Sequence, residues 1–351
     1  MSKVSIHLIT FNGEKYIPHC LRSLEDQTYK DFSLLIIDNN SQDQTTAIIG
    51  EYLQPQKHPF LKRVTKVVRN AKNLGFAGAH NQAIHWTKSD YVLLLNQDII
   101  LDSAYVEKLA DFFDTNKNAA CATGILYQWN FGQLTAHSPV LGKTTRIDSL
   151  GLKLFKNHRV VELKDTALLS QSKGKEKIEI FGVSGALPMY KREALEQSKI
   201  PTFITKGIAY EYFDSDFFAY KEDVDLAYRL ALFGHKSYLL PNAFAWHDRT
   251  AAQNAPMIKN RKLKSSFINY HSYKNHLYFL QKNVPSALWM RIGYKILFYE
   301  LAKFFFILFS EPKTIPALKE VVKNIVKMNK KRRYVQKKAG NDAWKNIRPW
   351  I

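Results

Sequence analysis

Short apolar runs alternate with amphipathic segments through the first 125 residues of the chain. The runs are almost continuously apolar, as in strands that are buried on both faces of a sheet. Between them, apolar residues recur every three to four positions, which predicts helices. The predicted strands are residues 4–10, 32–37, 64–68, 91–95 and 120–125, and the predicted helices are 14–27, one that ends near residue 53, 76–87 and 103–113. This alternation predicts an α/β fold with a mostly parallel, Rossmann-like sheet flanked by helices.

Polar residues cluster where the predicted strands end. The carboxyl ends of parallel strands lie at one edge of a sheet, and α/β proteins bind ligands beyond that edge. The clusters are Thr10, Phe11 and Asn12; Asp38, Asn39 and Asn40; Asn70 to Gly75; and Asn96, Gln97 and Asp98. The sequence therefore predicts a ligand site assembled from several separate turns.

Each cluster suits a different chemistry. Asp38 can accept a hydrogen bond from a nucleobase or a ribose, or it can close an Asx turn. The small residues from Asn73 to Gly78 place backbone N–H groups at a helix start, where they can meet a phosphate. Asp98 can hold a divalent cation on a diphosphate, because magnesium commonly takes only one or two protein carboxylates. The alternative role for Asp98 is to cap the following helix.

The chain between residues 128 and 200 contributes fewer signals. Residues 128–177 predict one or two hairpins followed by an exposed basic loop over residues 170–177. Residues 178–183 form a predicted strand that leads into three small residues, Ser184, Gly185 and Ala186. These small side chains would let a ligand approach the backbone, or would only allow tight packing.

An acid pair, Glu222 and Asp223, opens an amphipathic helix whose apolar residues follow a 3.6-residue period. Gly234 is expected to end this helix. A strand over residues 236–240 follows, and Pro241 is expected to end it. Acids at a helix start also cap the helix and suit its dipole, so the pair alone does not establish a catalytic role.

The order of these features resembles glycosyltransferase family two, the inverting GT-A enzymes. The resemblance covers about residues 3–250 and rests on TFN, NAKNLGFAGAHNQAI, DYVLLLNQD, VSGALPMYKREAL and the acid-pair segment. Within the family, GFAGAHN and LLLNQD look most like the bacterial rhamnosyltransferase-like branch, which builds surface polysaccharides. The resemblance implies a GT-A catalytic domain over residues 1–255, with a nucleotide-sugar-binding half (1–126) and an acceptor-binding half (127–255).

The resemblance also implies roles for individual residues. Asp223, with Glu222 beside it, would be the base that activates an acceptor hydroxyl. The residues that would hold the donor are Thr10, Phe11, Asn12, Asp38, Asn73, Gly75, Asn96 and Gln97. Those on the acceptor side would be Ser184, Gly185 and Ala186.

A divalent cation, Mg²⁺ or Mn²⁺, is the cofactor that the resemblance implies. Asp98 would hold it on the sugar diphosphate, and His247 would be a further ligand. Asn96 stands where the DxD motif of the family has its first Asp, so the site has one negative charge fewer and we expect a lower metal affinity. His247 follows Trp246 and is also consistent with an ordinary core histidine.

Residues 256–351 predict a helical, basic extension. The segment 287–309 is strongly apolar but contains four charged residues, so it has no uncharged run long enough to span a bilayer. It suits a helix that lies in the membrane interface, or one that packs on the catalytic domain. The net charge of the chain is +20, and half of it lies in residues 313–351, which would attract anionic lipid. Nucleic acid is not an expected partner, because no recognition fold accompanies the basic run.

The cysteines and the N-terminus indicate where the protein works. Cys20 and Cys121 lie in apolar runs and predict neither a disulfide framework nor a zinc site. The first residues carry no apolar run of signal-peptide length. The expected location is therefore the cytoplasm, at the inner face of the cell membrane.

The predicted function is transfer of a single sugar, with rhamnose as the first candidate, from a nucleotide-diphosphate donor to a hydroxyl of a glycan or lipid-linked glycan. Two alternatives come from other classes. A nucleotidyltransferase would need an Arg- or Lys-rich turn after the first strand to grip a triphosphate, and ITFNGEKY does not supply one. A non-catalytic, membrane-tethered nucleotide-sugar-binding or scaffold protein would release no sugar from the donor.

Overall fold

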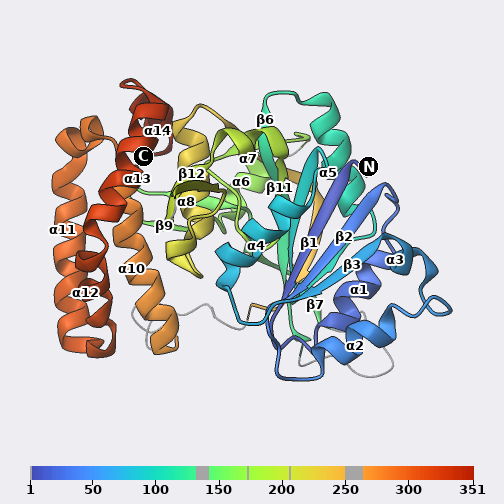
Figure 1. Ribbon diagram of the computed structural model, residues 1–351. Coiled ribbons are helices and arrows are strands. Elements are labelled where there is room, and N and C mark those ends of the chain that lie inside the picture. The colour runs from blue at the N-terminus through green and yellow to red at the C-terminus, as the bar shows by residue number, and fades with distance from the viewer. Residues whose placement is uncertain (1, 132–141, 172–173, 205–206, 250–263) are drawn as a thin grey trace.

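The computed structural model describes residues 2–131, 142–171, 174–204, 207–249 and 264–351. Figure 1 shows a curled central sheet with helices on both sides and a further layer of helices from the C-terminal part of the chain. The α/β fold and the C-terminal helical extension that the sequence predicts are confirmed. The predicted domain boundary between residues 255 and 256, and residues 172 and 173 of the predicted basic loop, fall outside the described residues.

The strands agree closely with the apolar runs of the sequence. Their bounds in the main sheet are β1 Val4–Thr10, β2 Phe32–Asp38, β3 Thr65–Arg69, β4 Tyr91–Asn96, β5 Ile99–Leu101, β6 Ala119–Trp129, β7 Lys143–Ser149, β10 Ile178–Ile180, β11 Met189–Lys191 and β14 Lys236–His247. The sheet order is β10-β14-β6-β11-β4-β1-β2-β3, with β5 beside β14 and β7 beside β6. Two hairpins lie apart from it: β8 Leu152–Leu154 with β9 Val160–Glu162, and β12 Ile200–Ile204 with β13 Gly207–Glu211. The hairpin β8–β9 confirms that residues 128–177 contain a hairpin.

The helices also follow the amphipathic segments. Those around the sheet are α1 Ile17–Glu25, α2 Thr45–Tyr52, α3 Pro59–Val64, α4 Gly75–Trp86, α5 Tyr105–Thr115, α6 Thr166–Gln171, α7 Arg192–Gln197, η2 Ser215–Phe217 and α8 Glu222–Leu232. Those of the extension are α10 Ser266–Asn283, α11 Ser286–Ser310, η3 Pro312–Thr314, α12 Pro316–Lys323, α13 Ile325–Ala339, α14 Trp344–Ile347 and η4 Arg348–Trp350. The sequence did not predict α3, because six residues are too few to display a helical period.

The direction of the strands departs from the prediction of a mostly parallel sheet. β3, β2, β1 and β4 run parallel to one another, and so do β6 and β14. β11 lies between β4 and β6 and is antiparallel to both. The sheet is therefore mixed. A strand of three residues is too short to show an alternating pattern, and its partners in the ladder are far away in the sequence.

Pro241 does not end the strand that precedes it, and that prediction is wrong. β14 continues to His247, and its pairing with β6 shifts by a bulge between Leu240 and Phe244. Pro241 lies in this bulge, where a residue without a backbone N–H costs no ladder hydrogen bond. The continuation carries His247 into register opposite Ile99 of β5, next to Asp98.

The extension shares a core with the sheet domain. α10 and α14 pack on α8, and a cluster of buried apolar side chains joins α8 to α10, α13 and α14. In Figure 1 these helices stand beside α8, on the side away from the blue N-terminal strands, and α11 and α12 are outermost. None of the helices in the described part of the chain has an apolar run long enough to cross a bilayer.

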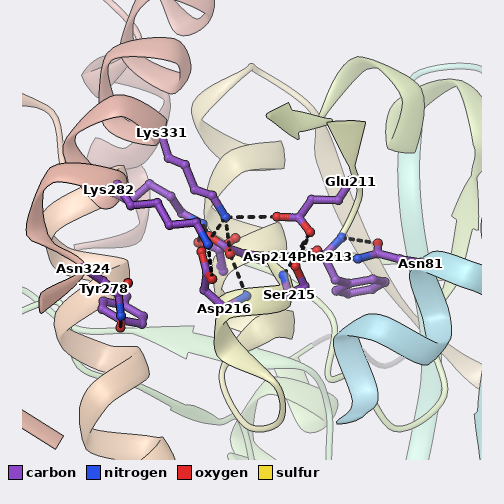
Figure 2. Close-up of polar contacts among 12 residues, drawn as sticks. Asn81, Glu211, Phe213, Asp214, Ser215, Asp216, Tyr278, Lys282, Asn324 and Lys331 are labelled. Carbon is purple, nitrogen blue, oxygen red and sulfur yellow. Dashed lines mark hydrogen bonds and ion pairs between the residues drawn. The ribbon is translucent and has the colours of Figure 1, made fainter. Parts of the chain in front are cut away.

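A buried ionic cluster also attaches the extension. Lys331 of α13 lies 3.0 Å from Glu211, 2.6 Å from Asp214 and 2.9 Å from Asp216. Figure 2 shows Lys331 among these three carboxylates. Lys282 of α10 pairs with Asp214 as well. Part of the predicted basic tail is therefore engaged in ion pairs inside the protein, rather than being free for a membrane surface.

Candidate functional site

A cavity of about 500 Å³ opens where the ends of β4 and β14, the start of α8 and the hairpin β8–β9 meet. Asp98 and Asp223, which are 125 positions apart in the sequence, both line it. The other predicted site residues that line it are Asn96, Ser184, Gly185, Ala186, Glu222 and His247. Tertiary structure thus assembles the predicted metal, acceptor and acid-pair residues into one cavity.

The acid pair begins α8. The N-cap of this helix is Lys221, whose side chain makes no capping hydrogen bond. Asp223 accepts hydrogen bonds from the backbone N–H groups of Gly185 (2.9 Å) and Val224 (2.7 Å). Both acids thus lie in the first turn, where the helix dipole favours negative charge. Both acids also border the cavity, so capping the helix is not the only role that their position allows.

The environment separates the two acids electrostatically. Burial raises the pKa of Glu222 well above its ordinary value, and the neighbouring Asp223 carboxylate raises it further. Burial and the Glu162 carboxylate also raise the pKa of Asp223. The hydrogen bond from the Gly185 N–H opposes this rise, because it stabilises the charged form. Glu222 Oε2 has no hydrogen-bond partner among the described residues. Asp223 is therefore the better placed of the two to act as an ionised base.

The loop before the acid pair is held in an unusual backbone conformation. Phe218, Tyr220 and Lys221 have φ values of 64°, 69° and 67°, in the left-handed region that such side chains seldom adopt. Each such residue costs on the order of 1–3 kcal/mol and persists only where the surroundings impose it. The conformation of this loop sets the direction in which α8 starts.

Asn275 of α10 supplies much of that constraint. Its Nδ2 group lies 2.9 Å from the carbonyl oxygens of Phe217 and Ala219 and 2.7 Å from that of Tyr220. The side chain is fully buried. One amide of the extension thus gathers three carbonyl groups of the loop that leads into Glu222.

Asn275 does not donate to the carbonyl of Phe218, which faces the turn predicted to bind the donor. The backbone N–H of Ala77 donates to the Phe218 carbonyl at 3.2 Å. Gly75 has a φ of 70°, and a Cβ atom there would come within 2.4 Å of the same carbonyl oxygen. Gly75 is therefore required by close backbone approach as well as by its own conformation. The turn predicted to bind the donor and the loop carrying the acid pair lie in direct contact.

His247 joins the cavity wall to a buried carboxylate. Its Nδ1–H donates to Asp148 at 2.8 Å, and its Nε2 lies 3.4 Å from Asp98. Burial would lower the pKa of His247, but the Asp98 and Asp148 carboxylates outweigh it and raise the pKa to about 9. The alternative of an ordinary core histidine does not describe this geometry, because the ring bridges two carboxylates and borders the cavity.

The side chains at Asp98 and His247 fit a divalent cation. Asp148 holds the ring so that Nε2 points toward Asp98, which is the carboxylate–histidine arrangement found behind metal ligands. Within the described residues no group of three or more His, Cys, Asp or Glu side chains is arranged to hold a metal. Two protein ligands suffice where a diphosphate completes the coordination shell, as with magnesium.

Sequence reasoning missed Arg249, which also lines the cavity. Its guanidinium lies 2.8 Å from Glu162 and 3.2 Å from Asp148. Burial would lower the pKa of Arg249, but these carboxylates raise it above its ordinary value. The sequence signal that could have indicated Arg249 is its position two residues after His247. Its partners Asp148 and Glu162 could not be predicted, because they lie in the stretch of chain with the least regular pattern.

The residues predicted to hold the nucleoside form a separate hydrogen-bonded network beyond β1 and β2. Thr10 Oγ1 donates to Gln97 Oε1 at 2.6 Å, and Gln97 Nε2 donates to the Phe11 carbonyl at 3.1 Å. Asn73 Oδ1 accepts from Asn39 at 2.8 Å. Asn39 and Ser41 are further members of this network, and each is bonded to two of the predicted donor residues. The predicted donor residues in the network are Thr10, Phe11, Asn12, Asp38, Asn73 and Gln97, and none of them lines the 500 Å³ cavity.

Asp38 closes a turn with its side chain, which was the alternative to its predicted role in binding the nucleoside. Both of its carboxylate oxygens accept from the Ser41 N–H at 3.2 Å, and Arg69 lies 3.3 Å away. The carboxylate is fully buried. Its contacts are thus those of a turn closed by a side chain, and a nucleoside role for Asp38 stays a prediction.

The sequence profile of one family, "Glycosyl transferase family 2", matches residues 5–198, which is more than half of the chain. The chain belongs to glycosyl transferase family 2. The matched region contains Asp98 and Ser184 to Ala186, and it ends before the acid pair and the extension. The rhamnosyltransferase-like branch is not tested by this match.

Curated relatives of this family 2 chain are distant, and each matches over only part of its length. An uncharacterized glycosyltransferase of Methanocaldococcus jannaschii is 29% identical over 36% of this chain and 41% of its own length. The poly-beta-1,6-N-acetyl-D-glucosamine synthase of Staphylococcus epidermidis is 24% identical over 69% of this chain and 49% of its own length. The alignments thus span less than half of these relatives.

Solved structures support the GT-A fold. GalNAc-T7, crystallised with UDP, GalNAc and Mn²⁺, has a TM-score of 0.60 and 15% identity, covering 95% of this chain and 55% of its own. S. aureus TarS residues 1–349 has a TM-score of 0.53 and 16% identity, covering 99% of this chain and 91% of its own. At these identities the likeness concerns the fold.

Proposed function

We propose that this protein is an inverting glycosyltransferase that moves one sugar from a nucleotide-diphosphate donor to a hydroxyl of a cell-surface glycan or lipid-linked glycan. The observation that carries the proposal is that Asp98, His247 and Asp223 line one cavity. Membership in family 2 supports the transferase activity. Relatives named for polysaccharide and teichoic acid synthesis support the kind of product.

Asp223 would take the proton of the acceptor hydroxyl as that oxygen attacks the anomeric carbon. The raised pKa of Asp223 suits this role, since a base works best with a pKa near the working pH. The bond to the nucleotide diphosphate breaks on the opposite side of the sugar, so the configuration inverts. Glu222, whose pKa is raised further, would stay protonated and could donate a hydrogen bond to the acceptor sugar.

Asp98 and His247 would hold a divalent cation, Mg²⁺ or Mn²⁺, against the donor diphosphate. Such an ion, when bound, neutralises the charge that grows on a departing diphosphate. Mn²⁺ in the GalNAc-T7 crystals supports this cofactor. Arg249 would add a fixed positive charge at the same wall of the cavity. The residues that would hold the nucleoside side of the donor are Thr10, Phe11, Asn12, Asp38, Asn73, Gly75, Asn96 and Gln97.

Association with the inner face of the cell membrane, from the cytoplasm, is part of the proposal. α11 buries Leu288, Ile296 and Ile307 against the protein. Its other face exposes apolar side chains at intervals of three and four residues, and Met290 and Phe298 are 80% and 78% exposed. The exposed residues are Met290, Tyr294, Leu297, Phe298, Leu301, Phe305, Leu308 and Phe309. A continuous exposed apolar stripe of this kind suits a helix lying in the interface of a bilayer.

The deciding experiment is a screen of nucleotide sugars with Mg²⁺ or Mn²⁺ present. The true donor should raise the thermal midpoint, because a ligand at 100 times its Kd adds about 2.7 kcal/mol to stability. It should also be hydrolysed slowly, and faster when an acceptor is added. Nucleotide-diphosphate rhamnose is the first candidate, because GFAGAHN and LLLNQD resemble that branch. Donor binding without any turnover would contradict the proposal and favour a non-catalytic binding protein.

A further inference from the structure

A second cavity of about 930 Å³ lies between the hairpin β8–β9, α11 and the last residues of the chain. This volume falls within the range of about 300 to 1,000 Å³ that small-molecule sites occupy. Lys153, Lys156 and Lys295 line it, together with aromatic residues that include Tyr294, Phe298 and Trp350. We call these six residues the basic-aromatic groove.

The charged side chains that line the groove are all cationic. None of the residues that line it carries an acidic side chain, whereas Arg159 adds a fourth cation beside the three lysines. Arg159 already stacks on Phe155 at 4.6 Å from the ring centre. Cations gathered with aromatic surface suit a ligand that has an anionic group and an apolar part, since each part then meets a matching surface.

The groove is continuous with two surfaces already described. Tyr294 and Phe298 belong both to the groove and to the exposed apolar stripe of α11. The hairpin connects the groove to the site of chemistry. At its base, Leu152 pairs with Glu162 and both line the cavity that contains Asp223, whereas Lys153 and the tip of the hairpin line the groove.

We propose that the basic-aromatic groove binds the phosphate-bearing lipid on which the acceptor glycan is carried. The phosphate is held by Lys153, Lys156 and Lys295. The hydrocarbon chain lies against Tyr294 and Phe298 and continues along α11 into the bilayer. The glycan then extends along the hairpin toward the acid pair. Only the identity of this lipid as the acceptor's carrier rests on the proposed function; binding of an anionic amphiphile does not.

The first test uses three probes on the purified full chain: decyl phosphate, decyl glucoside and inorganic phosphate, titrated calorimetrically below micelle formation. Decyl phosphate should bind at least about tenfold more tightly than decyl glucoside, because the neighbouring lysines attract the anionic head group and not the neutral one. Inorganic phosphate at the same concentrations should not displace it. Equal binding of the two decyl compounds would overturn the proposal, as would displacement by inorganic phosphate alone.

The second test reverses charge in the groove. The double variant Lys153→Glu, Lys295→Glu should weaken decyl phosphate binding at least about tenfold, while Lys153→Arg, Lys295→Arg retains it. Lys319→Glu is the matched control, because Lys319 is exposed on α12 and lies outside the groove. Circular dichroism and the thermal midpoint establish that each variant is folded. Unchanged binding by the folded double Glu variant would overturn the proposal.

Two further measurements separate this inference from its rivals. Sedimentation should show that decyl phosphate leaves the association state unchanged; a dimer that decyl phosphate dissociates would assign the groove to a second copy of the chain. With a lipid-linked acceptor, the double Glu variant should raise the KM for acceptor and leave the KM for donor unchanged. The binding tests require no nucleotide sugar, so a protein that binds decyl phosphate yet transfers no sugar contradicts the proposed function and not the groove.

Discussion

The side-chain amide of Asn275 donates to the backbone carbonyl of Tyr220 at 2.7 Å, two residues before Glu222. Asn275 belongs to α10 of the extension, which lies beyond the region that matches the family profile. The extension therefore forms part of the framework of the acid pair.

Replacement of Asn275 by Ala should release the loop before the acid pair and reduce turnover. We expect kcat to fall about 10- to 100-fold, since small displacements of a catalytic group have effects of this size. Donor binding should be unchanged. Amide hydrogen exchange of residues 217–223 should become faster in the variant, and this readout needs no enzymatic activity.

The matched control is Asn324→Ala. Asn324 also lies in the extension, and its amide donates to Tyr278 at 2.8 Å and to the Glu320 carbonyl at 3.1 Å. Among the described residues, its side chain makes no hydrogen bond to the loop before the acid pair. The variant should keep its kcat even if its thermal midpoint falls. Equal losses of kcat in the two variants would mean that Asn275 acts only through global stability.

Asp223→Asn should remove the base and leave the cavity in place. Loss of a general base typically costs 10²- to 10⁴-fold in rate, and we expect kcat to fall within that range. The affinity for donor, measured by thermal shift, should not change. Asp342→Asn, at an exposed site on the far part of the extension, is the control. Full activity of Asp223→Asn would rule out this residue as the base.

The pH dependence of kcat should report the raised pKa of Asp223. A base must be ionised, so kcat should rise with pH through a midpoint above the ordinary aspartate pKa of about 3.9. Burial is the largest cause of the raised pKa of Asp223, and the Glu162 carboxylate is the next. Glu162→Gln should therefore move this midpoint to lower pH. Rate profiles from pH 4 to 9 test both statements. A midpoint at or below 3.9 would contradict them.

Asp98→Ala should weaken donor binding and the response to Mg²⁺ or Mn²⁺ together, because one side chain serves both. Asp148→Asn should reduce metal affinity or activity about 10- to 100-fold, the usual effect of removing the carboxylate behind a histidine ligand. Both are measured by titrating metal at fixed donor concentration. Metal-independent donor binding in the wild type would exclude this metal site.

Lys331→Met should destabilise the protein by about 3 kcal/mol, because it removes one partner from a buried ionic cluster. Burial would raise the pKa of Asp214, but Lys282 and Lys331 hold it well below its ordinary value. The stability that Asp214 contributes is thus present above about pH 4 and is lost as pH falls further. The difference between wild type and variant in urea unfolding should therefore be full at pH 7 and should shrink below pH 4.

The positions of most strands and helices could be predicted from the sequence, because their apolar period reflects which face of each element is buried. β1 and α8 begin at the predicted residues. The period could not reveal β11, which is three residues long, or the bulge that allows β14 to pass Pro241. In both cases the decisive interaction is a ladder partner far along the chain.

The α/β pattern, the acid pair and the place of Asp98 at the end of a buried strand can be read from the sequence, because they depend on local order along the chain. The contacts by which Asp148 holds His247 and Asn275 holds the loop before Glu222 emerge only in the folded protein. A side-chain hydrogen bond leaves no period in the sequence. Its partners are chosen by packing, which brings together residues 99 and 55 positions apart.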